Sequence, residues 1–216
     1  MSNKYGITEV IEEVCAGGFS IATFGARVFY GVSGLEHLGN AMNAFNAERF
    51  NQRLEYFTFE HERISDKEKE KFYRELEHDK DKLNYLYEFV EKARTSTYDI
   101  HAKILANLSA RLIKYGKINY AEETLLVSLN TLTDFDIKLL YHIIRKNKQD
   151  ILSYKKINIS LESGDEKLAF TKLSKLDFIT EVSEEWGTQL DLSFRATSYS
   201  ILIFYVLDDS FKYNSF

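Results

Sequence analysis

Residues 166–182 read EKLAFTKLSKLDFITEV, and within this stretch the chain changes from a helical to a strand-like pattern. The helical part runs from Glu166 to Leu176, and Phe178–Val182 has the character of a short strand. A second run of strand character, Leu190–Phe194, follows, and an apolar helix is predicted for Ser198–Leu207. The predicted order around the quoted stretch is therefore a helix, two strands and a closing helix.

An earlier helix is predicted to begin at Thr133-Asp134-Phe135-Asp136, where a threonine stands three positions before an acidic residue, as in a capping box. Its apolar stripe comprises Ile137, Leu139, Leu140, Ile143 and Ile144. Helices followed by a β-hairpin wing and a closing helix form the layout of a winged helix, a fold of many DNA-binding proteins. We therefore predict a winged-helix-like domain with a small β-hairpin over residues 133–216.

The helix of this domain that would enter a DNA groove carries no net charge. Asp165–Asp177 contains Lys167, Lys172 and Lys175 against three acidic residues, and the wing that follows is acidic. Neutralised phosphates supply most non-specific DNA affinity, so nucleic acid is not the favoured partner. The alternative of a dimeric transcriptional regulator that contacts DNA through these three lysines stays open.

The chain before this domain has the pattern of a helical body over residues 46–132. Proline, the main helix breaker, is absent from all 216 residues. Ser65 to Glu68 and Asn119 to Glu122 have the spacing of capping boxes at helix starts, and Gly116 is placed to end a helix. The predicted fold is mainly α: a multi-helix body followed by the winged-helix-like domain.

Residues 1–45 form a glycine-rich, apolar N-terminal segment. Cys15–Gly34 contains one charge, Arg27, and its large apolar side chains include Phe19, Phe24, Val28 and Phe29. Twenty residues could span a bilayer as a helix, but a central arginine and several glycines oppose insertion. We expect this segment to be covered by protein, either by the same chain or by a second copy. A membrane-active effector that acts through residues 15–34 is a further alternative, which is not favoured.

No catalytic motif is found in the sequence, and the chain is not expected to be an enzyme or to bind a cofactor or metal. One cysteine excludes an intramolecular disulfide, and no phosphate loop or nucleophile elbow occurs. Among the histidines, His61 and His78 are expected on exposed helix faces, whereas His101 and His142 flank apolar stripes and are expected to be partly buried.

Composition and charge describe an ordinary globular protein. The hydrophobic fraction is 44%, the charged fraction 28% and the net charge −5. A negative chain is not a general binder of nucleic acid or of anionic membranes. The first residues do not resemble a secretory signal, so we expect a cytoplasmic location.

Several short motifs follow one another in a recognisable order. They are ERFNQRL at 48–54, FVEKAR at 89–94, KILANL at 103–108, LNTLT at 129–133 and FRAT at 194–197. In order and spacing, the chain resembles the Abi-alpha-like proteins, helical proteins of bacteria and mobile elements associated with abortive infection. The resemblance extends over most of residues 15–207. It implies a role in phage defence or phage–host conflict, and it implies no catalytic residues.

These observations together favour a non-enzymatic protein that acts by protein–protein interaction or oligomerisation, plausible in a phage–host conflict. The expected partner is a protein, which includes a second copy of the chain as a homo-oligomer. Fold alone does not decide between this reading and DNA binding, because winged helices serve both purposes.

Overall fold

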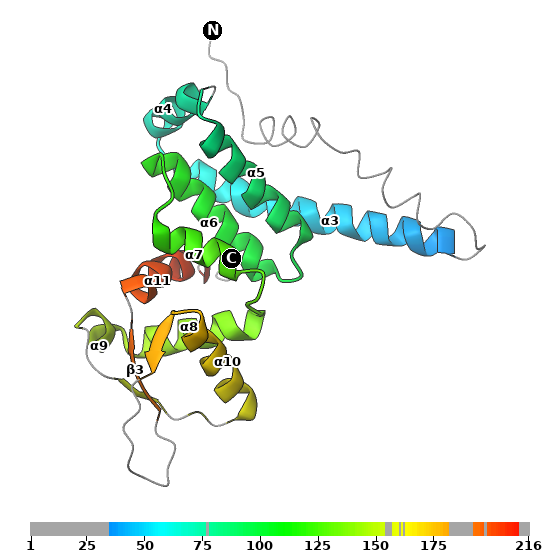
Figure 1. Ribbon diagram of the computed structural model, residues 1–216. Helices are drawn as coiled ribbons and strands as arrows, with labels where there is room; N and C mark the ends of the chain where they lie inside the picture. The colour runs from blue at the N-terminus through cyan, green and yellow to red at the C-terminus, as the bar shows by residue number, and fades with distance from the viewer. Residues whose placement is uncertain are drawn as a thin grey trace. The chain divides into compact units, whose positions relative to one another are not determined.

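The computed structural model describes residues 35–76, 78–153, 157–159, 161, 163–181, 192–196 and 198–211. Within these ranges the chain forms nine helices and three short strands (Figure 1). The prediction of a mainly α fold is thus confirmed. The side chains singled out in the N-terminal segment, Phe19, Phe24, Val28 and Phe29, lie outside the described residues.

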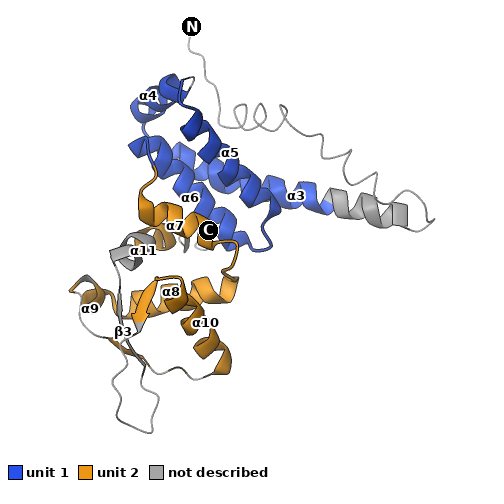
Figure 2. Cartoon of the chain, in the orientation of Figure 1, with its two compact units in different colours: residues 1–117 blue, residues 118–216 orange. Residues whose placement is uncertain are grey.

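The chain divides into two compact units, Met1–Lys117 and Ile118–Phe216 (Figure 2). The sequence predicted boundaries after residues 45 and 132, and the structure differs at both places. Residue 45 lies inside a long helix, which already begins at Leu35. The turn at residues 130–133 lies inside unit 2, because the helix that precedes it packs against the last helix of that unit.

Unit 1 is built around its fourth described helix. The four helices are α3 (Leu35–Glu62), α4 (Asp66–Leu76), α5 (Lys80–Thr95) and α6 (Asp99–Tyr115). Helix α6 contacts the other three, and every side chain from Ile100 to Ser109 is buried. A helix that is covered on all sides needs apolar residues around its whole circumference, which the run IHAKILANLS largely provides.

The ends of these helices follow the local signals in the sequence. The Ser65 hydroxyl accepts from the Glu68 amide at 3.4 Å, and the Ser65 amide donates back to the Glu68 carboxylate at 3.2 Å. This reciprocal pair is the predicted capping box at the start of α4. Gly116 ends α6 in the left-handed conformation, with φ 73°. A side chain is strained in that conformation, so glycine fits this position.

One buried side chain ties α3 to the turn between α5 and α6. Arg53 is 1% exposed, and its guanidinium donates to the carbonyls of Ala93 at 2.7 Å and Ser96 at 2.8 Å. It also donates twice to the Asp99 carboxylate, at 3.0 and 2.8 Å. Arg49, one turn earlier, donates to the carbonyl of Thr97. Donors from α3 thus reach one carbonyl in the last turn of α5 and two carbonyls of the turn that follows it.

Removing the Arg53 guanidinium should destabilise unit 1. In the Arg53→Met variant, two main-chain carbonyls lose a buried donor, which should cost about 2–4 kcal/mol of unfolding free energy. Arg74→Met is the matched control, because Arg74 is 76% exposed and pairs with Glu70 on the helix surface. It should cost less than about 1 kcal/mol. Urea denaturation followed by circular dichroism measures both, and equal costs for the two variants would contradict this account.

Unit 2 contains the remaining helices and all three described strands. The elements are α7 (Tyr120–Ser128), α8 (Asp134–Lys146), α9 (Lys148–Leu152), β1 (Ile157–Ile159), α10 (Gly164–Lys175), β2 (Ile179–Glu181), β3 (Leu192–Ala196) and α11 (Ser198–Phe211). Capping boxes open α7 at Asn119, α8 at Thr133 and α10 at Ser163. The first two of these were predicted from the sequence.

The three strands form one antiparallel sheet in the order β1-β3-β2. Ile179 pairs with Ala196 between β2 and β3, and Ile157 pairs with Phe194 between β1 and β3. The runs predicted at 178–182 and 190–194 overlap β2 and β3. Strand β1 was not predicted, because three residues are too few to show an alternating pattern.

The core of unit 2 lies where α8, α10, α11 and the sheet meet. Helix α8 buries Ile137, Leu140, Ile143 and Ile144, and α10 buries Ala169, Phe170 and Leu173. Helix α11 packs on α7 and α8, and its Phe204 ring stacks on Tyr141. The buried stripes leave one side of α8 and one side of α10 without a core role. The candidate site lies at the edge of those sides, where the buried Asp136 and Ala169 meet the exposed Phe135 and Leu168.

Candidate functional site: the surface between helices α8 and α10

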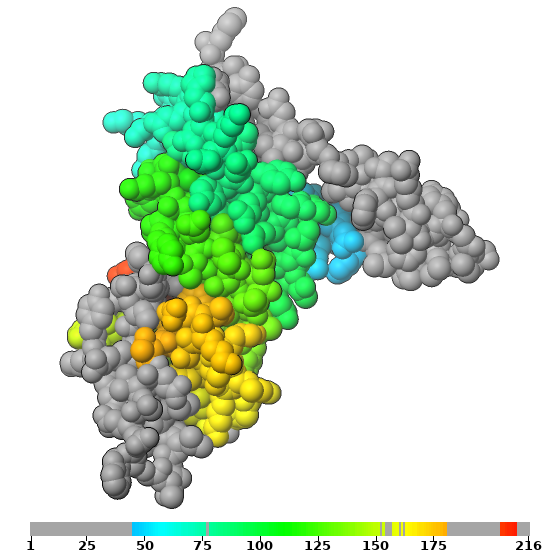
Figure 3. Space-filling view, in the orientation of Figure 1, coloured from blue at the N-terminus to red at the C-terminus, as the bar shows by residue number. Residues whose placement is uncertain are grey.

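An open pocket of about 370 Å³ lies between the start of α8 and the first turns of α10. We call it the α8–α10 pocket. It is lined by Thr133, Phe135, Asp136, Asp165, Leu168, Ala169 and Lys172. Figure 3 shows α10, coloured yellow, at the surface of unit 2.

An ion pair joins the two helices at this pocket. The Lys172 ammonium donates to the buried Asp136 carboxylate at 2.6 Å. The same carboxylate accepts from the amide and the hydroxyl of Thr133, at 2.7 and 2.8 Å, as part of the capping box of α8. Burial by itself would raise the pKa of Asp136, but the bonds from Lys172 and Thr133 outweigh it and lower the pKa. The carboxylate is therefore ionised, and its charge is matched within the protein.

Two apolar side chains stand at the pocket without a place in the core. Leu168 is 71% exposed and Phe135 is 47% exposed. Asp165, one turn before Leu168, is also exposed and has no ion-pair partner among the described residues. The pocket thus combines an apolar pair with one unmatched carboxylate.

The three lysines of the predicted DNA contact lie in different surroundings. Lys172 is committed to Asp136. Lys167 and Lys175 are exposed, but eight residues of helix separate them, which turns their side chains about 80° apart. Of the three, Lys172 therefore has a structural role that the sequence did not indicate.

The different roles of these lysines can be measured. Lys172→Met should lower the free energy of unfolding by about 1–3 kcal/mol, because the buried Asp136 carboxylate loses its charged donor. Lys167→Met, on the exposed side of the same helix, should change it by less than about 0.5 kcal/mol. Thermal and urea unfolding of the two variants provide the test. A stable Lys172→Met protein would show that the ion pair is dispensable.

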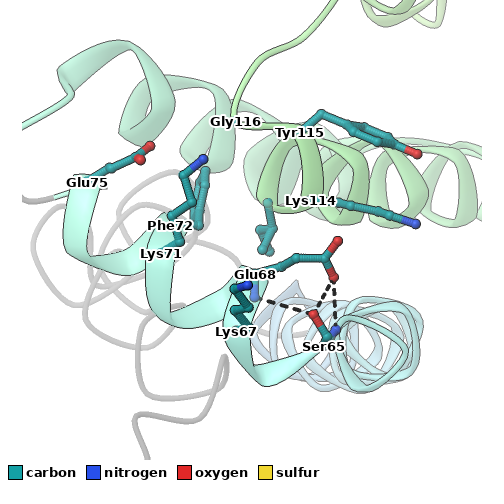
Figure 4. A pocket seen from close by; sticks show the side chains of 10 residues that line it. Ser65, Lys67, Glu68, Lys71, Phe72, Glu75, Lys114, Tyr115 and Gly116 are labelled. Atoms are coloured by element: carbon teal, nitrogen blue, oxygen red, sulfur yellow. Dashed lines mark hydrogen bonds between the residues drawn. The ribbon is translucent and has the colours of Figure 1, made fainter.

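A second pocket lies in unit 1, between α4 and the end of α6 (Figure 4). We call it the α4–α6 pocket; its volume is about 400 Å³. Its lining comprises Ser65, Lys67, Glu68, Lys71, Phe72, Glu75, Ile113, Lys114, Tyr115 and Gly116. The buried Phe72 and Ile113 form its apolar part, and the charged side chains stand around them.

The carboxylates of the α4–α6 pocket are already bonded within unit 1. Glu68 accepts from the Ser65 hydroxyl at 2.6 Å, and this bond lowers the pKa of Glu68. Glu75 accepts from Lys82 at 2.7 Å, which lowers its pKa as well. The Ser65 hydroxyl belongs to the capping box and is not placed beside a histidine. The hydrogen bonds of Ser65 and Glu68 at this pocket therefore serve the start of α4, and Glu75 is bonded to Lys82 of α5.

The histidines differ from the sequence-based expectations at two positions. His61, expected to be exposed, is half-buried and hydrogen-bonded to the Tyr73 hydroxyl at 2.8 Å. His142, expected to be partly buried, is exposed. His78 is exposed and His101 is buried against the Ser96 hydroxyl, as predicted. The periodicity of the neighbouring apolar residues did not predict the exposure of His61 and His142, because tertiary packing decides which side of a helix is covered.

Burial makes the His61–Tyr73 pair sensitive to acid. Burial, followed by the nearby Lys69, lowers the pKa of His61 from 6.5 to about 4. Burial raises the pKa of Tyr73 to about 12, so that its hydroxyl stays protonated. Both groups are therefore neutral at physiological pH.

The stability of the protein should depend on this histidine in mild acid. The unfolded chain binds a proton on His61 below pH 6.5, whereas the folded chain does so near pH 4. The contribution of His61 is therefore complete above pH 6.5 and decreases as the pH falls to about 4. Urea unfolding over this window should give a shallower pH dependence for His61→Gln than for the unchanged protein. His142→Gln is the control, and it should keep the original slope.

The described residues contain no group of three or more His, Cys, Asp or Glu side chains that could hold a metal ion. Within the same ranges, none of the helices has both the length and the apolar character that crossing a membrane requires.

Sequence reasoning missed the residues that shape the α8–α10 pocket. Phe135 and Leu168 each stand on the opposite side of their helix from the buried stripe, by the helical angle of about 100° per residue. An apolar residue outside such a stripe is a signal that the sequence does contain.

Comparison of the chain with protein-family models, with curated proteins and with solved structures found no match. The resemblance to the Abi-alpha-like proteins therefore stays a prediction.

Proposed function

We propose that this chain is a non-enzymatic interaction protein, and that the α8–α10 pocket is where it docks a protein partner. The observation that carries the proposal is the exposed pair Phe135 and Leu168, which share one pocket. Single exposed apolar residues are common on protein surfaces. Here two of them line one pocket, and the Asp136–Lys172 ion pair holds together the two helices that carry them. They therefore form a preorganised apolar contact.

The expected energy of such a contact is moderate. Full burial of a leucine or phenylalanine side chain contributes about 1.5–3 kcal/mol relative to exposure. Association costs at least about 4 kcal/mol in lost freedom of motion, so these two side chains can anchor an interface but need neighbouring contacts. A partner that covers part of α8 and part of α10 would supply them.

The biological setting belongs to the same proposal. The resemblance to the Abi-alpha-like proteins supports a role in phage defence or phage–host conflict, with a host protein, a phage protein or a second copy as the partner. We further propose that unit 2 is winged-helix-like. The succession of α8, α10, the paired strands β2 and β3, and α11 supports this relation. In this reading, the domain serves protein contact.

DNA binding is the second candidate function. Lys167 and Lys175 favour it, because both are exposed on the helix that precedes the paired strands. The commitment of Lys172 to Asp136 and the net charge of −5 oppose it. An electrophoretic shift with genomic fragments separates the two functions. A specific shift that the Lys167→Ala/Lys175→Ala variant loses would establish the regulator.

Changing Leu168 should weaken partner binding without unfolding the protein. Leu168→Asp places a charge at the pocket, and it should weaken the docked interaction about tenfold or more. Val127→Asp is the matched control, since Val127 is 62% exposed on α7 of the same unit. Sedimentation velocity measures self-association, and affinity capture from nuclease-treated native host cells measures other partners. If both variants keep every association of the unchanged chain, the α8–α10 pocket is not the docking site.

A further inference from the structure

We infer that the partner docked at the α8–α10 pocket is a helix that inserts an apolar side chain between Phe135 and Leu168 and presents a lysine or arginine to Asp165. This inference rests on the proposed function and names the chemistry of its partner. It follows from the distribution of matched and unmatched charges around the pocket.

The apolar part of the pocket sets the first requirement. Phe135 and Leu168 line it from α8 and α10, and the buried Ala169 lies among the lining residues. Because the pocket is open and has a volume of about 370 Å³, one bulky apolar side chain can enter between the two helices. Two exposed apolar side chains line this space, so an apolar group of the partner buries area against both, whereas a polar group would lose hydration there.

The charges set the second requirement. The acidic side chains at the start of α8 have partners in the protein: Asp134 pairs with Lys138 at 2.6 Å and Asp136 with Lys172 at 2.6 Å. Asp165 is exposed and has no ion-pair partner among the described residues. The nearest lysine in sequence, Lys167, is turned about 200° around α10 from Asp165. Among the described residues, the charge at the pocket that has no ion-pair partner is therefore negative, and complementarity favours a basic group on the partner.

The spacing on α10 sets the third requirement. Asp165 and Leu168 stand three residues apart in one helix and therefore face the same side. A partner helix with an apolar residue and a basic residue three or four positions apart presents the two matching groups at the same separation. Acidic partners would bring a like charge to Asp165 and are disfavoured.

The probe for this inference is a phage-displayed library of helical peptides, selected against the full chain. Selected sequences should combine a large apolar residue with lysine or arginine three or four positions away. The affinity of a selected peptide should fall about tenfold or more with Leu168→Asp and about two- to fivefold with Asp165→Asn. Asp165→Lys should reverse the selection toward glutamate and aspartate. Val127→Asp should leave the selected sequences and their affinities unchanged.

The outcomes separate the inference from the function beneath it. Some outcomes would overturn the inference but keep the docking site. One is that the peptides lose binding with Leu168→Asp but show no preference for lysine or arginine. Another is that they show this preference, but neither Asp165→Asn nor Asp165→Lys changes it. Peptides that bind Leu168→Asp as well as the unchanged chain would overturn both. Asp165→Asn preserves the shape of the side chain at the helix start, so it tests the charge even where Asp165→Lys fails to fold.

Discussion

The hydrogen bonds of the Arg53 guanidinium are the interaction on which unit 1 depends. They join three elements: the middle of α3, the last carbonyls of α5 and Asp99 at the start of α6. A helix end needs donors for its free carbonyls, and at the end of α5 the local bond from the Ser96 amide to the Lys92 carbonyl is joined by donors from α3. The direction in which α6 leaves the turn is thus fixed by a residue of α3, and α6 is the helix that the rest of unit 1 surrounds.

In unit 2 an ion pair joins two helices, and it also affects the surface of the unit. Lys172 and Asp136 hold α10 against the start of α8 at 2.6 Å. The bond pairs one of the three lysines that the DNA-binding alternative uses. Phe135 and Leu168 stay exposed at the pocket beside this ion pair. An interaction that stabilises the unit therefore also occupies one cation of α10, while two apolar side chains beside it stay exposed.

The sequence predicted those parts of the fold that depend on near neighbours. Ser65 with Glu68, Asn119 with Glu122 and the left-handed Gly116 all involve residues at most three positions apart or a single backbone conformation. Arg53 and Asp99 are separated by 46 residues, and no local pattern brings them together. The extent of β1 and the faces of His61 and His142 likewise depend on tertiary packing.

The candidate site shows the same division. The sequence grouped Lys167, Lys172 and Lys175 because they share a helix, but the partner of Lys172 is 36 residues away in the chain. The helical periodicity of the apolar residues indicates the buried stripes of α8 and α10. It also indicates that Phe135 and Leu168 lie outside those stripes. The periodicity does not show that these two residues line one pocket, since this depends on how α8 and α10 pack against each other. The periodicity of each helix indicates which apolar residues lie outside its core face, and the packing of the two helices decides which of them form a common surface.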